Sequence, residues 1–417
     1  MQAETNVSEW HADDKPAGTP YERAVLGFRN YWYPIAQSRQ VSNRPLRRIL
    51  LGDPIALFRR RGTVYATIDE CPHRGARISV GKDEFPGTTT IACRFHGWVF
   101  DVAQGGMCVA ALTDGPDSPV AGKIRLRIFP TEERKGIVWV WMGKGAPVPL
   151  EDDVPNLLLR DATIVKVRQA VVYGNWRYHA EGGLGNHAAM LHADAVGRLF
   201  RKQYAISGER KVGNVLVNDE DDGVYLASDQ QSGRSGPREP QSMYPGLGSW
   251  PAQRPWRIVP QNFRRPVLGK VRAAGTRLPG FLRIPNFPMI GALYYEWYVA
   301  VDKDHYLYFQ VSGHWPKNPI SKLWTHLWYH LWAGPIHKGR FNNQDKGMIG
   351  AQTDFTRRYG ANRPAKLYRP DVDPIDWIDM ANRYARGEPG TEPLPTSAMR
   401  TDTPAEPPVG QAQARVS

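Results

Sequence analysis

The pattern of apolar and polar positions divides the chain into a strand-rich first part and a mixed second part. Between residues 28 and 145, short alternating apolar runs such as GIVWVWMG at 136–143 are separated by turn residues, which predicts β-strands. A Pro-containing stretch at residues 146–155 predicts a boundary between two domains. We therefore expect a leader over residues 1–27, a mostly β domain over 28–145, a second domain over 146–392 and a disordered tail over 393–417.

The second domain is predicted to combine strands and helices. Residues 292–301 and 306–315 are rich in β-branched and aromatic side chains and flank a polar turn, which predicts an antiparallel hairpin. Leucines then recur every four positions, which predicts a helix over residues 320–333. His326 and His330 lie in this helix without an adjacent acid, and we interpret them as packing or surface residues. Residues 205–265 are polar and Gly-rich, and their pattern predicts no element.

Composition excludes several classes of protein. No run approaches the roughly 18 apolar residues of a membrane helix, and the polar N-terminus carries no apolar signal segment, so we expect a cytoplasmic protein without membrane contact. Three cysteines are too few for a disulfide framework. The net charge is +13, but the basic clusters are scattered and no nucleic-acid-reading motif accompanies them. The charge therefore favours docking of an acidic protein over binding of nucleic acid.

Two short segments supply a set of metal ligands. CPHRG at 71–75 and CRFHGW at 93–98 each offer one thiolate and one imidazole, with a glycine after each pair. A Rieske [2Fe-2S] cluster needs two cysteines on one iron and two histidines on the other. Structural zinc sites instead usually start from a Cys-x(2–4)-Cys pair, which this order does not match. We expect Cys71, His73, Cys93 and His96 to hold the cluster, and Cys108, which has no histidine nearby, to be a buried inert thiol.

A second histidine pair follows the predicted boundary. His187 and His192 are five residues apart, small residues separate them, and Glu181 precedes them. Non-haem Fe(II) oxygenases bind iron through two histidines and one carboxylate and leave positions for dioxygen and substrate. A pair at this spacing is also common in purely structural roles, so the residues alone leave both interpretations open.

With these motifs, LGFRNYWYP at 26–34, Asn175-Trp176, the sequence EWY at 296–298 and FNNQD at 341–345, the chain resembles the α subunits of Rieske ring-hydroxylating oxygenases over residues 25–385. Within them it is most similar to the carbazole-dioxygenase group. The resemblance implies an all-β Rieske domain followed by a helix-grip catalytic domain with a central antiparallel sheet. It also implies that Asp345 completes an iron site with His187 and His192, with Asp354 ranked second.

The resemblance has two departures. The spacing between His187 and His192 differs by one residue from that in the carbazole-dioxygenase group, although other members of the family share it, and the second departure concerns a bridging residue. The family places an Asp three residues before the first histidine ligand, where it bridges cluster and iron across a subunit interface, and Leu184 occupies that position here. Glu181 and Asn186 are the substitutes we expect. The resemblance further implies that large apolar or amphipathic side chains form the substrate pocket, namely Leu282, Ile284, Phe287, Tyr294 and Phe341.

The function implied is that of the terminal oxygenase of a multicomponent system. Electrons from NAD(P)H would arrive through a ferredoxin or reductase, and a head-to-tail α3 homotrimer would place the cluster of one subunit beside the iron of the next. The reaction expected is hydroxylation of an aromatic or heteroaromatic substrate, most simply dihydroxylation, with O2. A Rieske monooxygenase, acting as hydroxylase or demethylase, and a non-catalytic Rieske electron carrier are the alternatives.

Overall fold

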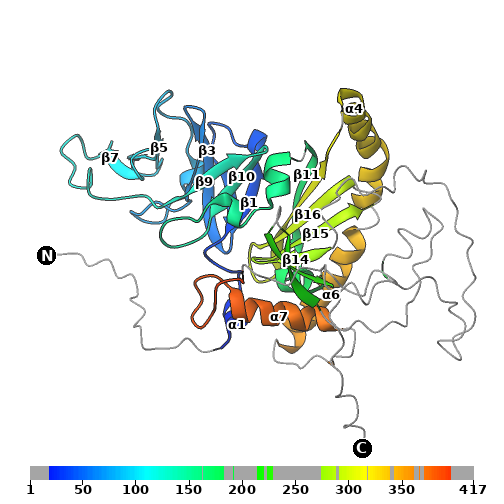
Figure 1. Cartoon of the computed structure of the whole chain (residues 1–417). Helices are drawn as coiled ribbons and strands as arrows, with labels where there is room; N and C mark the ends of the chain where they lie inside the picture. The colour runs from blue at the N-terminus through cyan, green and yellow to red at the C-terminus, as the bar shows by residue number, and fades with distance from the viewer. Residues whose placement is uncertain are drawn as a thin grey trace, which may run out of the picture.

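The protein is described by a computed structural model covering residues 18–161, 163–182, 191, 214–219, 223–228, 274–287, 291–316, 318–338, 342–360, 366 and 371–395. Strands dominate the first part and a long sheet flanked by helices forms the second, which confirms the α+β expectation (Figure 1). Among these residues, none of the helices combines the length and the apolar character that crossing a bilayer requires. In the described part of the predicted leader, residues 18–27, helix α1 (Pro20–Arg23) contacts α7 (Val372–Tyr384).

The first part consists of three small antiparallel sheets, as the alternating apolar runs predict. The sheets have the orders β1-β10-β9, β2-β3-β4-β8 and β5-β6-β7. The strands are β1 (Trp32–Gln37), β2 (Leu46–Leu50), β3 (Asp53–Arg60), β4 (Thr63–Ile68), β5 (Thr90–Ala92), β6 (Trp98–Asp101), β7 (Met107–Ala111), β8 (Ile128–Phe129), β9 (Thr131–Arg134) and β10 (Ile137–Trp141). Short helical turns lie at Ser38–Gln40 and Ile78–Val80.

The second part is built on a seven-stranded antiparallel sheet of order β11-β17-β16-β15-β14-β13-β12. Its strands are β11 (Thr163–Tyr173), β12 (Asn214–Asp219), β13 (Gly223–Ser228), β14 (Gly275–Arg277), β15 (Phe281–Phe287), β16 (Gly291–Ala300) and β17 (His305–His314). The helices are α2 (Trp176–Gly182), α4 (Pro319–Trp328), α5 (Gly334–Ile336), α6 (Asn342–Tyr359) and α7, with wide turns at Leu157–Asp161 and Tyr329–Ala333 and a short turn at Leu150–Asp152.

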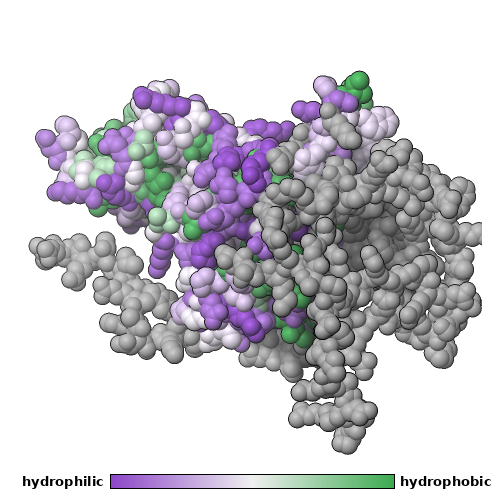
Figure 2. All heavy atoms as spheres, in the orientation of Figure 1, coloured by the Kyte–Doolittle hydropathy of each residue, from purple (hydrophilic) through white to green (hydrophobic). Residues whose placement is uncertain are grey.

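The predicted hairpin and helix are both confirmed. β16 and β17 pair from Leu293 opposite Gly313 to Ala300 opposite Tyr306, and the backbone N–H of Val301 donates to the carbonyl of His305 to close the turn. The helix begins at Pro319 because Asn318 accepts from the backbone N–H of Ser321 in a capping box. Its apolar side chains are exposed at Ile320, Leu323, Trp324 and Leu327, as is Leu331 in the following turn, and Figure 2 shows a small hydrophobic patch at the free end of α4.

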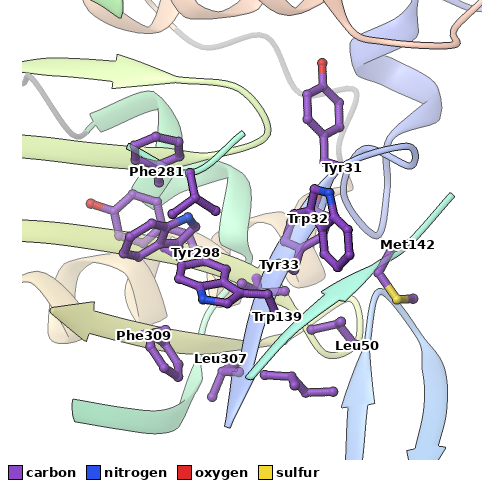
Figure 3. Packing of buried hydrophobic residues seen from close by; sticks show 14 of the residues in the cluster. Tyr31, Trp32, Tyr33, Leu50, Trp139, Met142, Phe281, Tyr298, Leu307 and Phe309 are labelled. Carbon is purple, nitrogen blue, oxygen red and sulfur yellow. The ribbon is translucent and has the colours of Figure 1, made fainter. Parts of the chain in front are cut away.

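The two parts share one hydrophobic core. Period-two alternation in β16 and β17 places one set of side chains, including Trp297 and Phe309, toward the first part. There Trp297 meets Trp139 of β10 edge to face, with ring centroids 5.5 Å apart, and Figure 3 shows β1 and β10 side chains facing those of β15–β17. The predicted boundary packs into this core through the buried Leu150 and Val154. The division of the chain into separate domains therefore stays a prediction.

Candidate functional site: two metal-binding regions

The two cysteine-histidine segments form loops with the same hydrogen-bonding pattern. The backbone N–H of Cys71 donates to the carbonyl of Ala76, and that of Cys93 donates to the carbonyl of Trp98, both at 2.8 Å. Within each loop the backbone N–H of the glycine donates a hydrogen bond to the carbonyl of the cysteine, at 2.8 Å for Gly75 and 2.9 Å for Gly97. Both glycines have a positive φ, 72° and 67°, a backbone conformation in which a residue with a side chain would be strained. The glycine after each ligand pair is thus explained by the loop geometry.

The four side chains meet as two unlike pairs. The thiols of Cys71 and Cys93 lie within hydrogen-bonding reach of each other and are buried, and burial raises the pKa of Cys71 to about 12. The rings of His73 and His96 lie together nearer the surface, with centroids 4.7 Å apart. His73 also stacks on Trp98 at 4.9 Å. The sulfur atoms that could bind metal are therefore buried, and the imidazole nitrogens that could bind metal lie nearer the surface.

This arrangement fits a two-iron cluster better than a single ion. A mononuclear structural zinc site gathers its four ligands around one ion, whereas here the two thiols and the two imidazoles form separate pairs. A cluster with one thiolate-bound and one imidazole-bound iron instead requires separate Cys-Cys and His-His pairs.

Cys108 is buried, as predicted. It belongs to the small core beneath the two loops, and its Sγ donates to the carbonyl of Ala110 at 3.5 Å. Burial raises the pKa of its thiol, which keeps it protonated and unreactive.

The second metal region is only partly described. His187, His192 and Asn186 lie outside the described residues. Asp345, the predicted carboxylate ligand, is in the first turn of α6 and is buried, whereas Asp354 on the same helix accepts from the Tyr173 hydroxyl at an exposed position. Helix α6 contacts α2, which leads directly into the His187–His192 segment. These positions favour Asp345 over Asp354 as a ligand.

Glu181, one predicted bridging residue, is engaged within its own chain. It lies near the end of α2, and its carboxyl accepts a hydrogen bond from the hydroxyl of Tyr21 in α1. Burial raises the pKa of Glu181 to about 8. The guanidinium of Arg177 lies over the Tyr21 ring at 4.6 Å, and it donates to the Tyr21 carbonyl.

Three of the predicted pocket residues share one face of the long sheet. Leu282 pairs with Glu296 and Ile284 pairs with Tyr294, so these four side chains project to the same side of the sheet. Leu282 and Tyr294 are buried, and Ile284 is partly buried. Phe287 ends β15, and its side chain is not among those described; Phe341 lies outside the described residues.

The same face carries a buried carboxylate that the sequence analysis missed. Glu296 accepts hydrogen bonds from the hydroxyls of Tyr294, Tyr298 and Tyr308, and from the Gln310 amide at 3.2 Å. Burial raises the pKa of Glu296, and the three tyrosine donors oppose that shift. The signal was present in the sequence, because an acidic residue in the centre of an aromatic strand, with tyrosines two positions away on either side, has to be buried and paired.

Comparison with known proteins agrees with this architecture. Residues 31–122 match the Rieske [2Fe-2S] domain, and residues 258–388 match the homotrimeric ring hydroxylases. The terminal oxygenase component of carbazole 1,9a-dioxygenase from a Sphingomonas species is 30% identical over 388 residues, covering 88% of this chain and 94% of that protein. The solved reduced complex between oxygenase and ferredoxin in carbazole 1,9a-dioxygenase superposes with a TM-score of 0.68 at 27% identity, covering 88% of this chain and 92% of the matched chain.

A more limited similarity links the chain to a demethylase. The oxygenase component of dicamba O-demethylase from Stenotrophomonas maltophilia is 37% identical over 119 residues, which is 28% of this chain and 33% of that protein. The carbazole oxygenase, in contrast, matches nearly from end to end and so covers both metal-binding regions. The chain therefore belongs to the Rieske ring-hydroxylating oxygenases, the enzymes that its two cysteine-histidine loops and its long antiparallel sheet indicated.

Proposed function

We propose that the chain is the terminal oxygenase of a multicomponent system and hydroxylates an aromatic or heteroaromatic substrate with O2, most simply by dihydroxylation. The observation that carries this proposal is the pairing of the cluster loops with a second region where Asp345 is buried beside the helix that leads to His187 and His192. The near full-length similarity to a carbazole dioxygenase component supports the aromatic substrate class.

The cluster loops are the proposed entry point for electrons. Three exposed arginines surround them, namely Arg74, Arg77 and Arg94. Phe95 is 65% exposed, and its ring lies against that of His96 with centroids 4.0 Å apart. A basic rim with an apolar centre suits an acidic ferredoxin or reductase that collects electrons from NAD(P)H. A similar oxygenase has been solved in complex with its ferredoxin, which supports a partner of this kind.

His187, His192 and Asp345 are the residues that would hold a mononuclear Fe(II). That iron supplies the activation of dioxygen, which protein side chains cannot perform themselves. Asp345 would supply the carboxylate ligand, and its side chain is buried. Leu282, Ile284 and Tyr294 would bind and orient a flat substrate, since their side chains project from the same face of the sheet.

A homotrimer would complete the electron path. The cluster loops beside β5 and the helix α6 lie at opposite ends of the described protein (Figure 1). A head-to-tail ring brings the cluster of one subunit to the iron of the next, and the match to homotrimeric ring hydroxylases supports such a ring. Asn186 or Glu181 would bridge the two centres. Glu181 would first have to release its hydrogen bond with Tyr21.

A Rieske monooxygenase is the second candidate, because the chain is also similar to an O-demethylase component. That similarity covers 28% of the chain, whereas the carbazole oxygenase matches 88%. Counting the labelled oxygen atoms that ¹⁸O2 delivers into the product separates the two reactions.

The decisive experiment uses the purified full chain with a ferredoxin and reductase and a panel of aromatic substrates. We expect about three irons per chain, two in the cluster and one mononuclear. Both His192→Ala and Asp345→Ala should lose about one iron and all turnover, yet keep the Rieske EPR signal and the visible spectrum. Finding two irons per chain in a wild-type protein that shows the Rieske EPR signal but turns over no substrate would contradict the proposal and indicate an electron carrier.

A further inference from the structure

One face of the β16–β17 hairpin is polar although it is buried. Tyr294, Glu296 and Tyr298 alternate along β16, and Tyr308 and Gln310 alternate along β17 opposite them. All five side chains are almost inaccessible to solvent. A buried carboxylate is tolerated only where hydrogen bonds satisfy both of its oxygens. Here four side chains donate hydrogen bonds to Glu296, so both of its oxygens are satisfied and its burial is tolerated.

One oxygen of the carboxylate is connected to α6. Glu296 Oε1 accepts from the hydroxyl of Tyr308, and that hydroxyl in turn accepts from Asn342 Nδ2 at 3.0 Å. Asn342 is the first residue of α6 and is 1% exposed. Asp345 follows in the first turn of the same helix. A movement of the Tyr308 hydroxyl would therefore be transmitted to the start of α6 and to Asp345.

The other oxygen is connected to α2. Glu296 Oε2 accepts from the hydroxyl of Tyr298 at 2.7 Å. The Tyr298 ring stacks on the imidazole of His179 in α2, with centroids 4.1 Å apart and planes 17° from parallel. His179 Nδ1 is also 2.8 Å from the hydroxyl of Tyr306. Helix α2 is thus held on the sheet through tyrosines of both strands.

We infer that Glu296 is a positioning residue that fixes the position of α6 relative to α2. One carboxylate oxygen is linked to α6 through Tyr308, and the other is linked to α2 through Tyr298. The inference rests on the proposed function in one respect, namely that Asp345 and the histidines after α2 are iron ligands. Glu296 itself would not contact the metal. Its role is to pre-organise the two helices, so that the ligands already lie close together before the metal binds.

Glu296→Gln tests this inference with little change of volume. The amide replaces one acceptor with a donor, so at least one tyrosine hydroxyl that donates to Glu296 loses its acceptor and has to reorient. We expect the affinity for Fe(II), measured by competition with a chelator, to fall about 10- to 100-fold, as with other residues that orient metal ligands. Amide hydrogen exchange in the iron-free protein should become faster in α2 and in the first turn of α6, but not in α7. The visible spectrum of the cluster should remain unchanged.

Two further variants and one control separate positioning from general destabilisation. Tyr308→Phe should loosen α6 more than α2, because it removes the hydroxyl that links Glu296 to Asn342, whereas Tyr298→Phe should loosen α2 more than α6. Phe309→Leu changes a fully buried side chain on the opposite face of the same strand, so it should lower the melting temperature without changing the Fe(II) affinity. These tyrosine variants also serve if Glu296→Gln does not fold.

The outcomes are distinguishable. The inference would be overturned if Glu296→Gln left both the Fe(II) affinity and the amide hydrogen exchange of α2 and α6 unchanged. The same result in both tyrosine variants would also overturn it. Exchange that rises equally in α2, α6, α7 and the Phe309→Leu control would also overturn it, by showing a general loss of stability. A wild-type protein that binds no third iron would instead refute the proposed function, while the exchange measurements would still report on the two helices.

Discussion

Replacing Trp139 by alanine tests whether the two parts of the chain share one core. Trp139 is fully buried in β10 and meets Trp297 of β16 edge to face at 5.5 Å. Its indole N–H has no hydrogen-bond partner within the described residues, so truncation removes packing and leaves no acceptor without a donor. The loss is therefore that of a large buried ring and its cavity, about 3–5 kcal/mol.

The size of the protein converts this loss into a temperature shift. Unfolding entropies of about 2.1 cal/mol/K per residue give about 0.9 kcal/mol/K for 417 residues. A loss of about 3–5 kcal/mol then lowers the melting temperature by about 3–6 °C. Ile375→Ala on α7, where the side chain is 47% exposed, is the control and should change the free energy of unfolding by less than about 1 kcal/mol.

The assay follows heating with two signals. Tryptophan fluorescence includes the signal of the buried tryptophans of the shared core, and visible absorbance reports on the cluster in the first part. We expect both transitions to move down together in Trp139→Ala. The reasoning would be refuted if cluster bleaching kept its wild-type temperature while the fluorescence transition fell, because the first part would then unfold independently.

Two further predictions concern the cysteines and Glu181. Cys93→Ser should abolish the visible absorbance of the cluster, whereas Cys108→Ser should keep it, and loss of absorbance in both would show that Cys108 is also required. Because the pKa of Glu181 is raised to about 8 in the folded protein from an ordinary value near 4.5, its contribution to stability is present at low pH and is lost as the pH rises through that window. Glu181→Gln should therefore flatten the decline in melting temperature between about pH 4.5 and pH 8, and a decline as steep as that of the wild type would contradict this assignment.

The cluster loops and the long hairpin were predictable because their determinants are local. The ligand pairs Cys71/His73 and Cys93/His96 occupy short loops, so the number of residues between them already restricts how the donors can be arranged. The period of two in β16 and β17, with a polar turn between them, predicts an antiparallel hairpin without knowledge of the rest of the chain. The carboxylate assignment, Asp345, came from resemblance, and burial in α6 now supports it.

Other features depend on contacts between residues far apart in the chain, which no local pattern contains. The strand pattern around Glu296 indicates that it is buried, but only the β16–β17 register places Tyr308 and Gln310 beside it, and only folding brings Asn342 of α6 to the Tyr308 hydroxyl. The burial that raises the pKa of Glu181 likewise depends on folding, which brings Tyr21, 160 positions earlier in the chain, into hydrogen-bonding contact with its carboxyl. The amino-acid order was thus sufficient for the ligand types and the strand periodicity, because backbone geometry over a few residues governs both. Packing settled which polar groups are buried together, because burial and hydrogen bonding depend on neighbours that only folding brings close.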